Sequence, residues 1–485
     1  MNYKMMGRFL SLILIAEGIF MIPALGISIA DGTSHVTYAF LVTLGIIFSI
    51  AALLLLITRR AEKRFFAKEG LFCVGLSWIV MSLFGCLPFC FSGEIPHYVD
   101  ALFEMVSGFT TTGASIVRDV EALSRGILYW RSFSHWVGGM GVLVFLLAIV
   151  PMSGKSEGFT MHLLRAESPG PNVGKLVPKM RQTAAVLYIT YLVLTALNVL
   201  FLLFGGVSFF ESVCTAFGTA GTGGFGLKND SIAGYSPYVQ NVCTVFMLLF
   251  GVNFGCYYLL LLKQVRDVFR DEELRLYMGF VAGSILLISF NVRGLYSTFG
   301  ESLRHAAFQV SSIITTTGFA TADFDQWPCL SKSILLVLMM IGACAGSTGG
   351  GLKCARVLLI IKGVRRNLAQ MLRPKKVQVI RFNDKPMEEK IIANTNAYLC
   401  AYSLIMVISF LLISVDDFSV ITNFSAVVSC FNNIGPGFDM VGPTCNYADY
   451  SFFSKIVLIL DMLAGRLEIF PILALLSLKT WKPTR

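Results

Sequence analysis

Thr110-Thr111-Thr112-Gly113 is the first of four short glycine-bearing segments that recur at nearly even intervals along the chain. The other three read Ala220-Gly221-Thr222-Gly223, Thr315-Thr316-Thr317-Gly318 and Asn432-Asn433-Ile434-Gly435. Each segment follows a short apolar stretch and precedes polar sequence rich in turn-forming residues. Recurrence of this kind indicates a repeated structural unit rather than chance. The four segments therefore predict a chain built from four related parts.

The composition places these parts in a membrane. Hydrophobic residues make up 55% of the 485 residues and charged residues only 14%, whereas soluble domains carry about 25% charged residues. Residues 7–30 and 36–58 form apolar runs, each longer than the about 20 residues that cross a bilayer. The first run is too long for a signal peptide, and a second span follows it at once. We therefore predict an all-α polytopic membrane protein.

The repeated unit consists of a long apolar helix, a short apolar helix, a glycine loop and a second long helix. The short helices are about half as long as a crossing requires, which is typical of re-entrant segments, and we expect them at 98–109, 208–217, 301–314 and 418–431. The second long helices are expected at 127–150, 238–262, 331–361 and 452–478. The predicted domains are two leading transmembrane helices at 1–69 and four pseudo-symmetric repeats at 70–182, 183–276, 277–393 and 394–485.

The net charge of +10 reflects topology rather than nucleic-acid binding. Most Lys and Arg residues lie at the two termini or in the segments 59–69, 151–182, 263–276 and 362–393. This asymmetry follows the positive-inside rule, which predicts that both termini and the basic connections are cytoplasmic. Contact with anionic lipids accounts for the remaining surplus. The cysteines and histidines lack metal-ligand spacing, and no nucleophile–base pair suggests an enzyme.

The loops have the chemistry of a cation pathway. Non-helical backbone inside a bilayer persists only beside protein or water, and glycine adopts the positive φ angles that turn successive carbonyls toward one axis. A short helix ending at the loop directs the negative end of its dipole there. Close helix packing is the competing explanation for each glycine, but four loops in register favour the pore. Acidic residues after the loops would concentrate cations: Asp119, Asp230, Asp323, Asp325 and Asp439.

Four longer motifs surround the loops: residues 107–115 (SGFTTTGAS), 222–226 (TGGFG), 315–323 (TTTGFATAD) and 432–437 (NNIGPG). Together they resemble the pore loops of the TrkH/TrkG family of potassium uptake proteins, part of the Trk/Ktr/HKT superfamily. The resemblance covers essentially the whole chain. It implies four units around one pore, with the selectivity glycines at Gly113, Gly223, Gly318 and Gly435.

The resemblance also implies the residues of a potassium filter. The expected filter residues are Thr111, Thr112, Gly113, Thr222, Gly223, Gly224, Thr316, Thr317, Gly318, Asn433, Ile434 and Gly435. Potassium itself is expected at Thr111, Thr112, Thr222, Gly223, Thr316, Thr317, Asn433 and Ile434. The second and fourth loops lack the triple threonine, so the ion sites should be less regular than in a fourfold channel. Potassium is then a transported ion, and no organic cofactor is expected.

A gate is predicted below the filter. The stretch Gly342–Gly351 contains five glycines, enough to interrupt the helix 331–361, since each interior glycine costs about 1 kcal/mol relative to alanine. Arg466 lies in the last apolar span, where a central arginine costs about 2.5–3.5 kcal/mol, so it needs a role or an ion-pair partner. In the resembling family a mobile loop and a pore-facing arginine lie here. The implied gate residues are Gly346, Gly349, Gly350, Gly351, Lys353 and Arg466.

The expected function is potassium uptake across a bacterial inner membrane. The resemblance implies a homodimer gated by a cytosolic TrkA-type nucleotide-binding ring, for which the basic segments 362–393 and 151–182 are candidate contact surfaces. A proton- or sodium-coupled secondary transporter built on broken helices stays open as the alternative. It is less favoured because all four loops enter from the same side.

Overall fold

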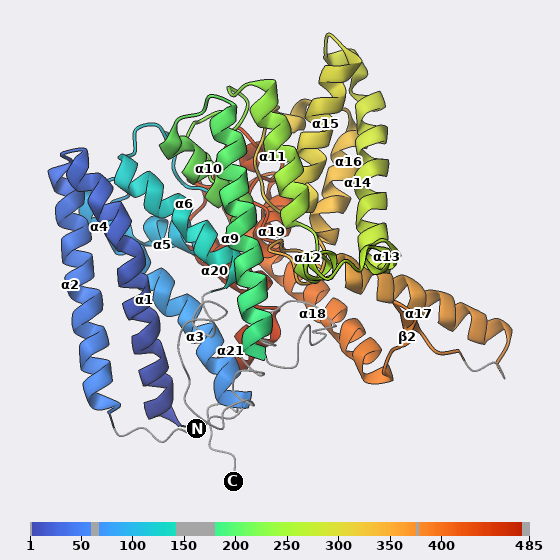
Figure 1. The fold of residues 1–485 in the computed structure, drawn as a ribbon, viewed down its shortest axis with the longest axis horizontal. Coiled ribbons are helices and arrows are strands. Elements are labelled where there is room, and N and C mark those ends of the chain that lie inside the picture. The colour runs from blue at the N-terminus through green and yellow to red at the C-terminus, as the bar shows by residue number, and fades with distance from the viewer. Residues whose placement is uncertain (1, 60–66, 142–179, 375–377, 478–485) are drawn as a thin grey trace.

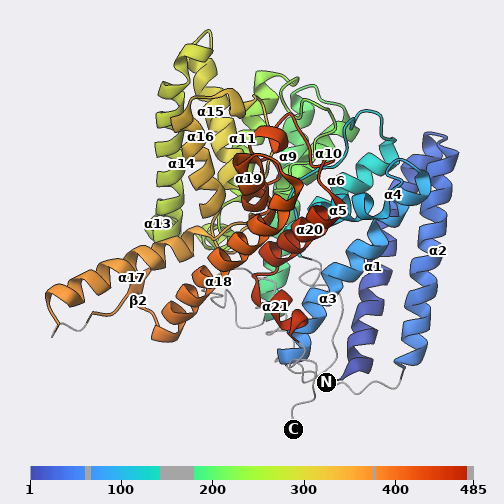
Figure 2. The same cartoon turned by 180° about the vertical axis from the view of Figure 1, so that it is seen from behind.

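The computed structural model describes residues 2–59, 67–141, 180–374 and 378–477. Its helices include six that are long and apolar enough to cross a membrane, or seven if one bent pair counts as a single span. Two leading helices, α1 (Tyr3–Ala30) and α2 (Ser34–Ile57), lie side by side at one edge of the molecule (Figures 1 and 2). They pack on the first repeat through α3, α4 and α6, whose bounds follow.

Four repeats of the predicted kind follow the leading helices, which confirms the predicted fold class. The first long helices are α3 (Ala67–Gly85) continued by α4 (Leu87–Ser92), then α9 (Met180–Phe204), α14 (Glu272–Asn291) and α18 (Glu389–Ile413). The short helices are α5 (Tyr98–Phe109), α10 (Phe209–Gly221), α15 (Phe299–Ile314) and α19 (Val420–Phe431). After the loops come α6 (Arg125–Met140), α11 (Pro237–Phe250), α16 (Cys329–Ile341) and α20 (Phe452–Arg466).

The repeats close into a circle. Each short helix packs on the helix that follows its own loop and also on the corresponding helix of the preceding repeat. Thus α10 packs on α6, α15 on α11 and α19 on α16. The circle is completed by α5, which packs on α20 of the last repeat. Four segments distant in sequence are thereby brought around one centre.

All four helices after the loops end about halfway through the expected span, a feature predicted for the third repeat alone. The break in 331–361 is confirmed: α16 gives way to residues 342–353 and then to α17 (Cys354–Leu372). The continuous helix predicted at 238–262 is wrong, because α11 and α12 (Phe254–Leu261) meet at 88°. The helix predicted at 452–478 is also interrupted, between α20 and α21 (Phe470–Leu476). In the first repeat α6 ends at Met140, and residues 142–150 lie outside the described part.

The remaining elements connect these helices. The basic segment after α17 contains a hairpin, a two-stranded antiparallel sheet of β1 (Arg381–Phe382) and β2 (Lys385–Pro386), which projects with α17 from the side opposite α2 (Figure 1). A short helix, α13 (Val265–Arg270), precedes α14. Single 3-10 turns are η1 (Arg293–Leu295), η2 (Phe324–Gln326), η3 (Ser414–Asp416) and η4 (Asp439–Val441).

Glycine lets the helices after the loops approach the short helices closely. A Cβ atom at Gly138 in α6 would lie 1.9 Å from the carbonyl oxygen of Phe109, the last residue of α5. A Cβ atom at Gly465 in α20 would lie 1.9 Å from the carbonyl oxygen of Phe431, the last residue of α19. The first and fourth repeats therefore use the same close contact, which no side chain larger than hydrogen can share.

Gly465→Ala should destabilise the fold, because the new methyl group meets backbone rather than a flexible side chain; overpacking of this kind costs about 1–3 kcal/mol or more. The measurement is the thermal unfolding midpoint of the detergent-solubilised protein. Gly279→Ala in α14 is the matched control, since a Cβ there meets nothing within 4 Å, and its midpoint should be unchanged or higher. Equal midpoints for the two variants would contradict the close contact.

Candidate functional site: a ring of four loops

The four glycine loops share one backbone conformation. The first residue of each has a φ angle between 53° and 57°: Thr111, Thr222, Thr316 and Asn433. The glycine two residues later has a φ angle between 75° and 103°: Gly113, Gly224, Gly318 and Gly435. The intervening N–H donates to the carbonyl five residues earlier in every loop, at 2.8–3.0 Å. Three β-branched threonines at positive φ are a strained choice, and such strain typically concentrates at functional sites.

This shared conformation corrects the register of the second loop. The residue equivalent to Gly113 is Gly224, whereas Gly223 is equivalent to Thr112, because its N–H donates to the carbonyl of Gly218 as that of Thr112 donates to Ser107. The alignment of Gly223 with the other three glycines is therefore wrong by one residue. The set of twelve predicted residues is unaffected, because it holds the three equivalent positions of each loop.

The four glycines form a closed ring. A Cβ atom at Gly113 would lie 2.0 Å from the carbonyl oxygen of Gly223 in the next loop. The same test on Gly224 gives 2.0 Å to the Thr317 carbonyl, and on Gly318 gives 2.1 Å to the Ile434 carbonyl. Gly435 closes the ring at 2.8 Å from the carbonyl of Thr112. Each loop thus rests on its neighbour, and the fourth rests on the first.

Four equivalent carbonyl groups in this ring have no hydrogen-bond donor within the described ranges: Thr112, Gly223, Thr317 and Ile434. All four residues are buried. Buried carbonyls are normally paired, so a ring of unpaired ones is a site where oxygen atoms are left for another partner. Carbonyl oxygens in such rings replace the hydration shell of a monovalent cation.

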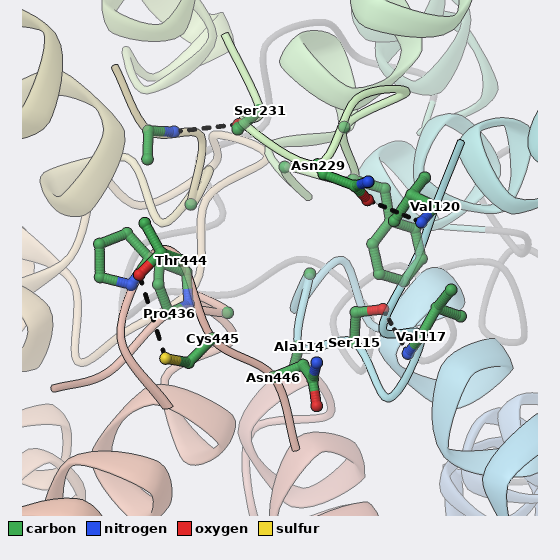
Figure 3. A pocket seen from close by; sticks show the side chains of 18 of the residues that line it. Ala114, Ser115, Val117, Val120, Asn229, Ser231, Pro436, Thr444, Cys445 and Asn446 are labelled. Carbon is green, nitrogen blue, oxygen red and sulfur yellow. Dashed lines mark hydrogen bonds between the residues drawn. The ribbon is translucent and has the colours of Figure 1, made fainter. Parts of the chain in front are cut away.

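A cavity of about 160 Å³ opens on one side of the ring (Figure 3). All four glycines line it, together with residues that follow each loop, including Ser115, Asn229 and Pro436. No carboxylate belongs to its lining among the described residues, although Arg118, Arg131 and Lys228 do. The acidic residues expected to concentrate cations are therefore not part of this lining.

Two of those acidic residues instead hold the connections after their loops, Asp119 across two repeats and Asp439 within the fourth repeat. The Asp119 carboxylate accepts a hydrogen bond from the Asn229 amide at 2.9 Å, which lowers the pKa of Asp119. The Asp439 carboxylate accepts hydrogen bonds from the Ser419 and Thr422 hydroxyls, both at 2.7 Å, and these two hydroxyls lower the pKa of Asp439. Both carboxylates thus fix the segments that surround the cavity.

Buried polar side chains support the ring from behind. Arg131 in α6 donates to Glu104 in α5 at 2.6 Å and to the Gly226 carbonyl at 3.0 Å. His135 in the same helix contacts the Gly108 carbonyl through Nδ1 at 2.8 Å and accepts the N–H of Phe225 through Nε2 at 3.2 Å. A neutral imidazole with its proton on Nδ1 satisfies both contacts. Together these side chains join the first and second loops.

The glycine-rich segment 342–353 lies against the ring on the side opposite the cavity, since it touches residues at the start of the third and fourth loops. The Gly350 N–H donates to the Thr316 hydroxyl at 2.6 Å. Cβ atoms at Gly349 and Gly350 would lie 2.8 Å from the Thr315 carbonyl and 2.3 Å from the Asn432 carbonyl. The segment thus packs directly on the third and fourth loops.

Three cationic side chains hold or flank this segment. Arg466 donates to the Thr348 carbonyl at 2.8 Å and to the carbonyls of Gly138 and Gly139 at 2.5 and 2.9 Å. Arg466 therefore links the segment to the end of α6. Lys353 donates to the Gly349 carbonyl, and Arg356 forms an ion pair with Glu468.

The bend of the second repeat and the segment 342–353 satisfy each other's backbone groups. The Cys344 N–H donates to the Gly251 carbonyl at 3.1 Å, and the Phe254 N–H donates to the Gly346 carbonyl at 3.0 Å. A single oxygen of Glu273 in α14 accepts the N–H groups of Ala345 and Ala355 at 2.6 and 3.0 Å. Backbone groups left unpaired where helices end thus find partners in the adjoining repeat or at the start of α14. The predicted residues Gly346, Gly349, Gly350, Gly351, Lys353 and Arg466 all lie at this one junction.

Four functional side chains were not predicted from the sequence: Glu104, Arg131, His135 and Glu273. The cost of a charge in an apolar span, the rule that singled out Arg466, applies equally to Arg131. Its partner Glu104 lies on another helix, so spacing along one helix could not reveal the pair. Glu273 stands at a helix start, where an acidic residue is ordinary.

Comparison with known proteins agrees with this architecture. The family model TrkH, described as a cation transport protein, matches residues 38–482. The chain is 35% identical to the Trk system potassium uptake protein TrkH of Salmonella typhimurium, covering 99% of this chain and 100% of the relative. The Trk system potassium uptake protein TrkG of Escherichia coli is 31% identical over 92% of each chain. The crystal structure of the potassium transporter TrkH from Vibrio parahaemolyticus matches 99% of the chain with a TM-score of 0.86 at 27% identity. The chain therefore belongs to the TrkH family of cation transport proteins.

Proposed function

We propose that this protein takes up potassium ions through the ring of four loops, in a bacterial inner membrane with both termini in the cytoplasm. The observation that carries the proposal is the ring itself, in which four equivalent carbonyls lack hydrogen-bond donors among the described residues. The names of the relatives support potassium as the ion. They also support a transporter rather than an enzyme, with potassium as cargo and not as a resident cofactor.

The segment 342–353 is the gate in this proposal. It covers the end of the ring opposite the cavity and is fixed there by Arg466 and Glu273. Opening a path for ions then requires this segment to leave Thr316 and Asn432, which it contacts directly. The positive charge of Arg466 adds an electrostatic barrier to cations on the same side.

The proposed assembly is a homodimer that binds a cytosolic TrkA-type ring. Helix α17 and the hairpin after it present exposed basic residues, including Arg365, Arg373 and Lys385, and these suit an acidic surface on the TrkA-type ring. Both adjoin the start of α14, because Asn383 of the hairpin donates to Asp271 at 2.6 Å and Lys362 of α17 donates to Glu272 at 2.5 Å. Glu273 follows Glu272 directly and accepts hydrogen bonds from the gate segment. A displacement of the hairpin could therefore be transmitted to the gate through the start of α14. The other candidate surface, 151–182, lies almost wholly outside the described residues.

Gly113→Ser should lower the selectivity for potassium over sodium, because the added side chain meets the Gly223 carbonyl and forces the ring to widen. The measurement is uptake into liposomes under a potassium or sodium gradient, with no proton gradient. Gly206→Ser is the matched control: its φ angle is 77°, but a Cβ there meets nothing within 4 Å, so selectivity should not change. Unchanged selectivity in a folded Gly113→Ser protein would remove the filter assignment.

Arg466→Ala should raise the basal flux measured without the TrkA-type partner, because both the charge and the hydrogen bond to the Thr348 carbonyl are lost. Arg466→Lys separates the two effects, since lysine keeps the charge but lacks the guanidinium fork that reaches several carbonyls. If the flux rises in both variants, the hydrogen bonds of Arg466 keep the gate closed. If the flux rises in the alanine variant alone, the positive charge keeps it closed. Arg293→Ala, at an exposed arginine, should leave the flux unchanged. Folded Arg466 variants with no gain in flux would contradict the gating role.

Arg373→Gln combined with Lys385→Gln should weaken binding of the TrkA-type ring, because two exposed positive charges of the hairpin are removed. Binding is measured by pull-down at low and physiological ionic strength, since rim charges act most strongly at low salt. Lys4→Gln with Arg8→Gln is the control, as it removes the same charge from an exposed part of α1. Equal losses in both double variants would point to a general charge effect and not to the hairpin.

A further inference from the structure

The fourth loop differs from the other three in the hydrogen bonding of its glycine carbonyl. The Gly435 carbonyl accepts hydrogen bonds from the Ser429 and Tyr447 hydroxyls, both at 2.7 Å. The carbonyls of Gly113, Gly224 and Gly318 accept none from the described part of the chain. At the level of the glycines, therefore, three carbonyls have no donor among the described residues and one has two.

The third loop shows what has changed. Ser312 and Ser429 occupy the same position in their short helices, four residues before the first residue of the loop. Ser312 donates to the carbonyl of Phe319, the residue after the glycine, at 2.6 Å. Ser429 instead donates to the carbonyl of the glycine itself. In the fourth loop, the carbonyl that accepts the serine hydroxyl is therefore one residue earlier than in the third loop, and it belongs to the glycine of the ring.

The sequence gives a physical reason for this change. Pro436 follows Gly435, whereas Ala114, Phe225 and Phe319 follow the other glycines. The ring of a proline restricts the backbone of the preceding residue. Accordingly, the φ angle of Gly435 is 103°, compared with 75° to 86° for the other three glycines. The peptide after Gly435 is therefore oriented differently from its counterparts.

Tyr447 is held in place to make this contact. The residue is 2% exposed, its N–H donates to the Ser115 carbonyl of the first repeat at 2.9 Å, and its ring packs on Phe103 at 5.7 Å between centroids. Its hydroxyl group can donate only one hydrogen bond, and that bond goes to Gly435. Tyr447 thus spans the junction between the last and the first repeat, beside the cavity.

We propose that Tyr447, assisted by Ser429, is a selectivity-setting residue that withholds the Gly435 carbonyl from the permeating cation. The inference rests on the proposed function. An ion at the level of the glycines then has three backbone oxygens available instead of four. A site with fewer ligands binds a partly dehydrated potassium ion less tightly and discriminates less against sodium. Tyr447 touches no ion and acts by positioning the carbonyl.

The test is Tyr447→Phe, which keeps the ring packing and removes the hydroxyl. The potassium concentration for half-maximal uptake in liposomes should fall by about 2- to 10-fold, the size of one hydrogen bond's net contribution, and the potassium-to-sodium ratio should rise. The double variant with Ser429→Ala should enlarge both shifts. Tyr450→Phe is the matched control: that buried tyrosine stacks on Tyr447, but its hydroxyl donates to Asn423 at 3.0 Å, and its variant should leave both values unchanged.

The outcomes separate the possible failures. A fall in the maximal rate with unchanged half-saturation and selectivity in Tyr447→Phe and in the double variant would show that Tyr447 only packs the repeats, and would overturn the inference. If Gly113→Ser changes selectivity while the Tyr447 variants do not, this inference fails and the filter stands. If none of these folded variants changes selectivity, the filter assignment itself fails.

Discussion

The contact of each loop glycine with a carbonyl of the next loop is the constraint on which the structure depends. At four places the distance leaves no room for a Cβ atom, and the four contacts form one closed circuit. The packing of each short helix on two neighbouring helices brings the loops to this distance. Buried side chains such as Arg131 and His135 then fix the loops from behind. Fold and site are thus set by the same contacts.

The broken helices follow from this arrangement. If the helices continued straight past Phe250 and Ile341, the glycine-rich segment 342–353 could not lie beneath the ring. Instead, the segment 342–353 lies there, and it pairs its backbone groups with the bend at Gly251 and with Glu273. The interruption of α20 similarly frees Glu468 to pair with Arg356 at the start of α17. One repeat's irregularity is therefore stabilised by that of another.

The repeated unit was predictable because Thr110–Gly113 and Thr315–Gly318 are identical, and each lies between apolar runs of informative length. The break in the third repeat was also predictable, since five glycines lie close together. The breaks after Phe250 and Arg466 were not, because neither contains a run of glycines like that of the third repeat and their stabilising partners lie on other repeats. The register of the second loop was ambiguous for a different reason: Gly223 and Gly224 are adjacent, and only the φ angles and hydrogen bonds of the folded loop distinguish them.

The use of one chain for all four loops has a genetic consequence. In a channel made of four identical subunits, a mutation in the filter appears four times at once. In this protein a mutation alters a single quarter of the ring, and the other quarters keep their backbone geometry. The loops are therefore free to diverge after internal duplication, provided that the chain still fits at each junction. The Gly435-Pro436 pair is one product of that freedom, and a subunit that had to repeat it fourfold would carry the altered peptide at every position of the ring.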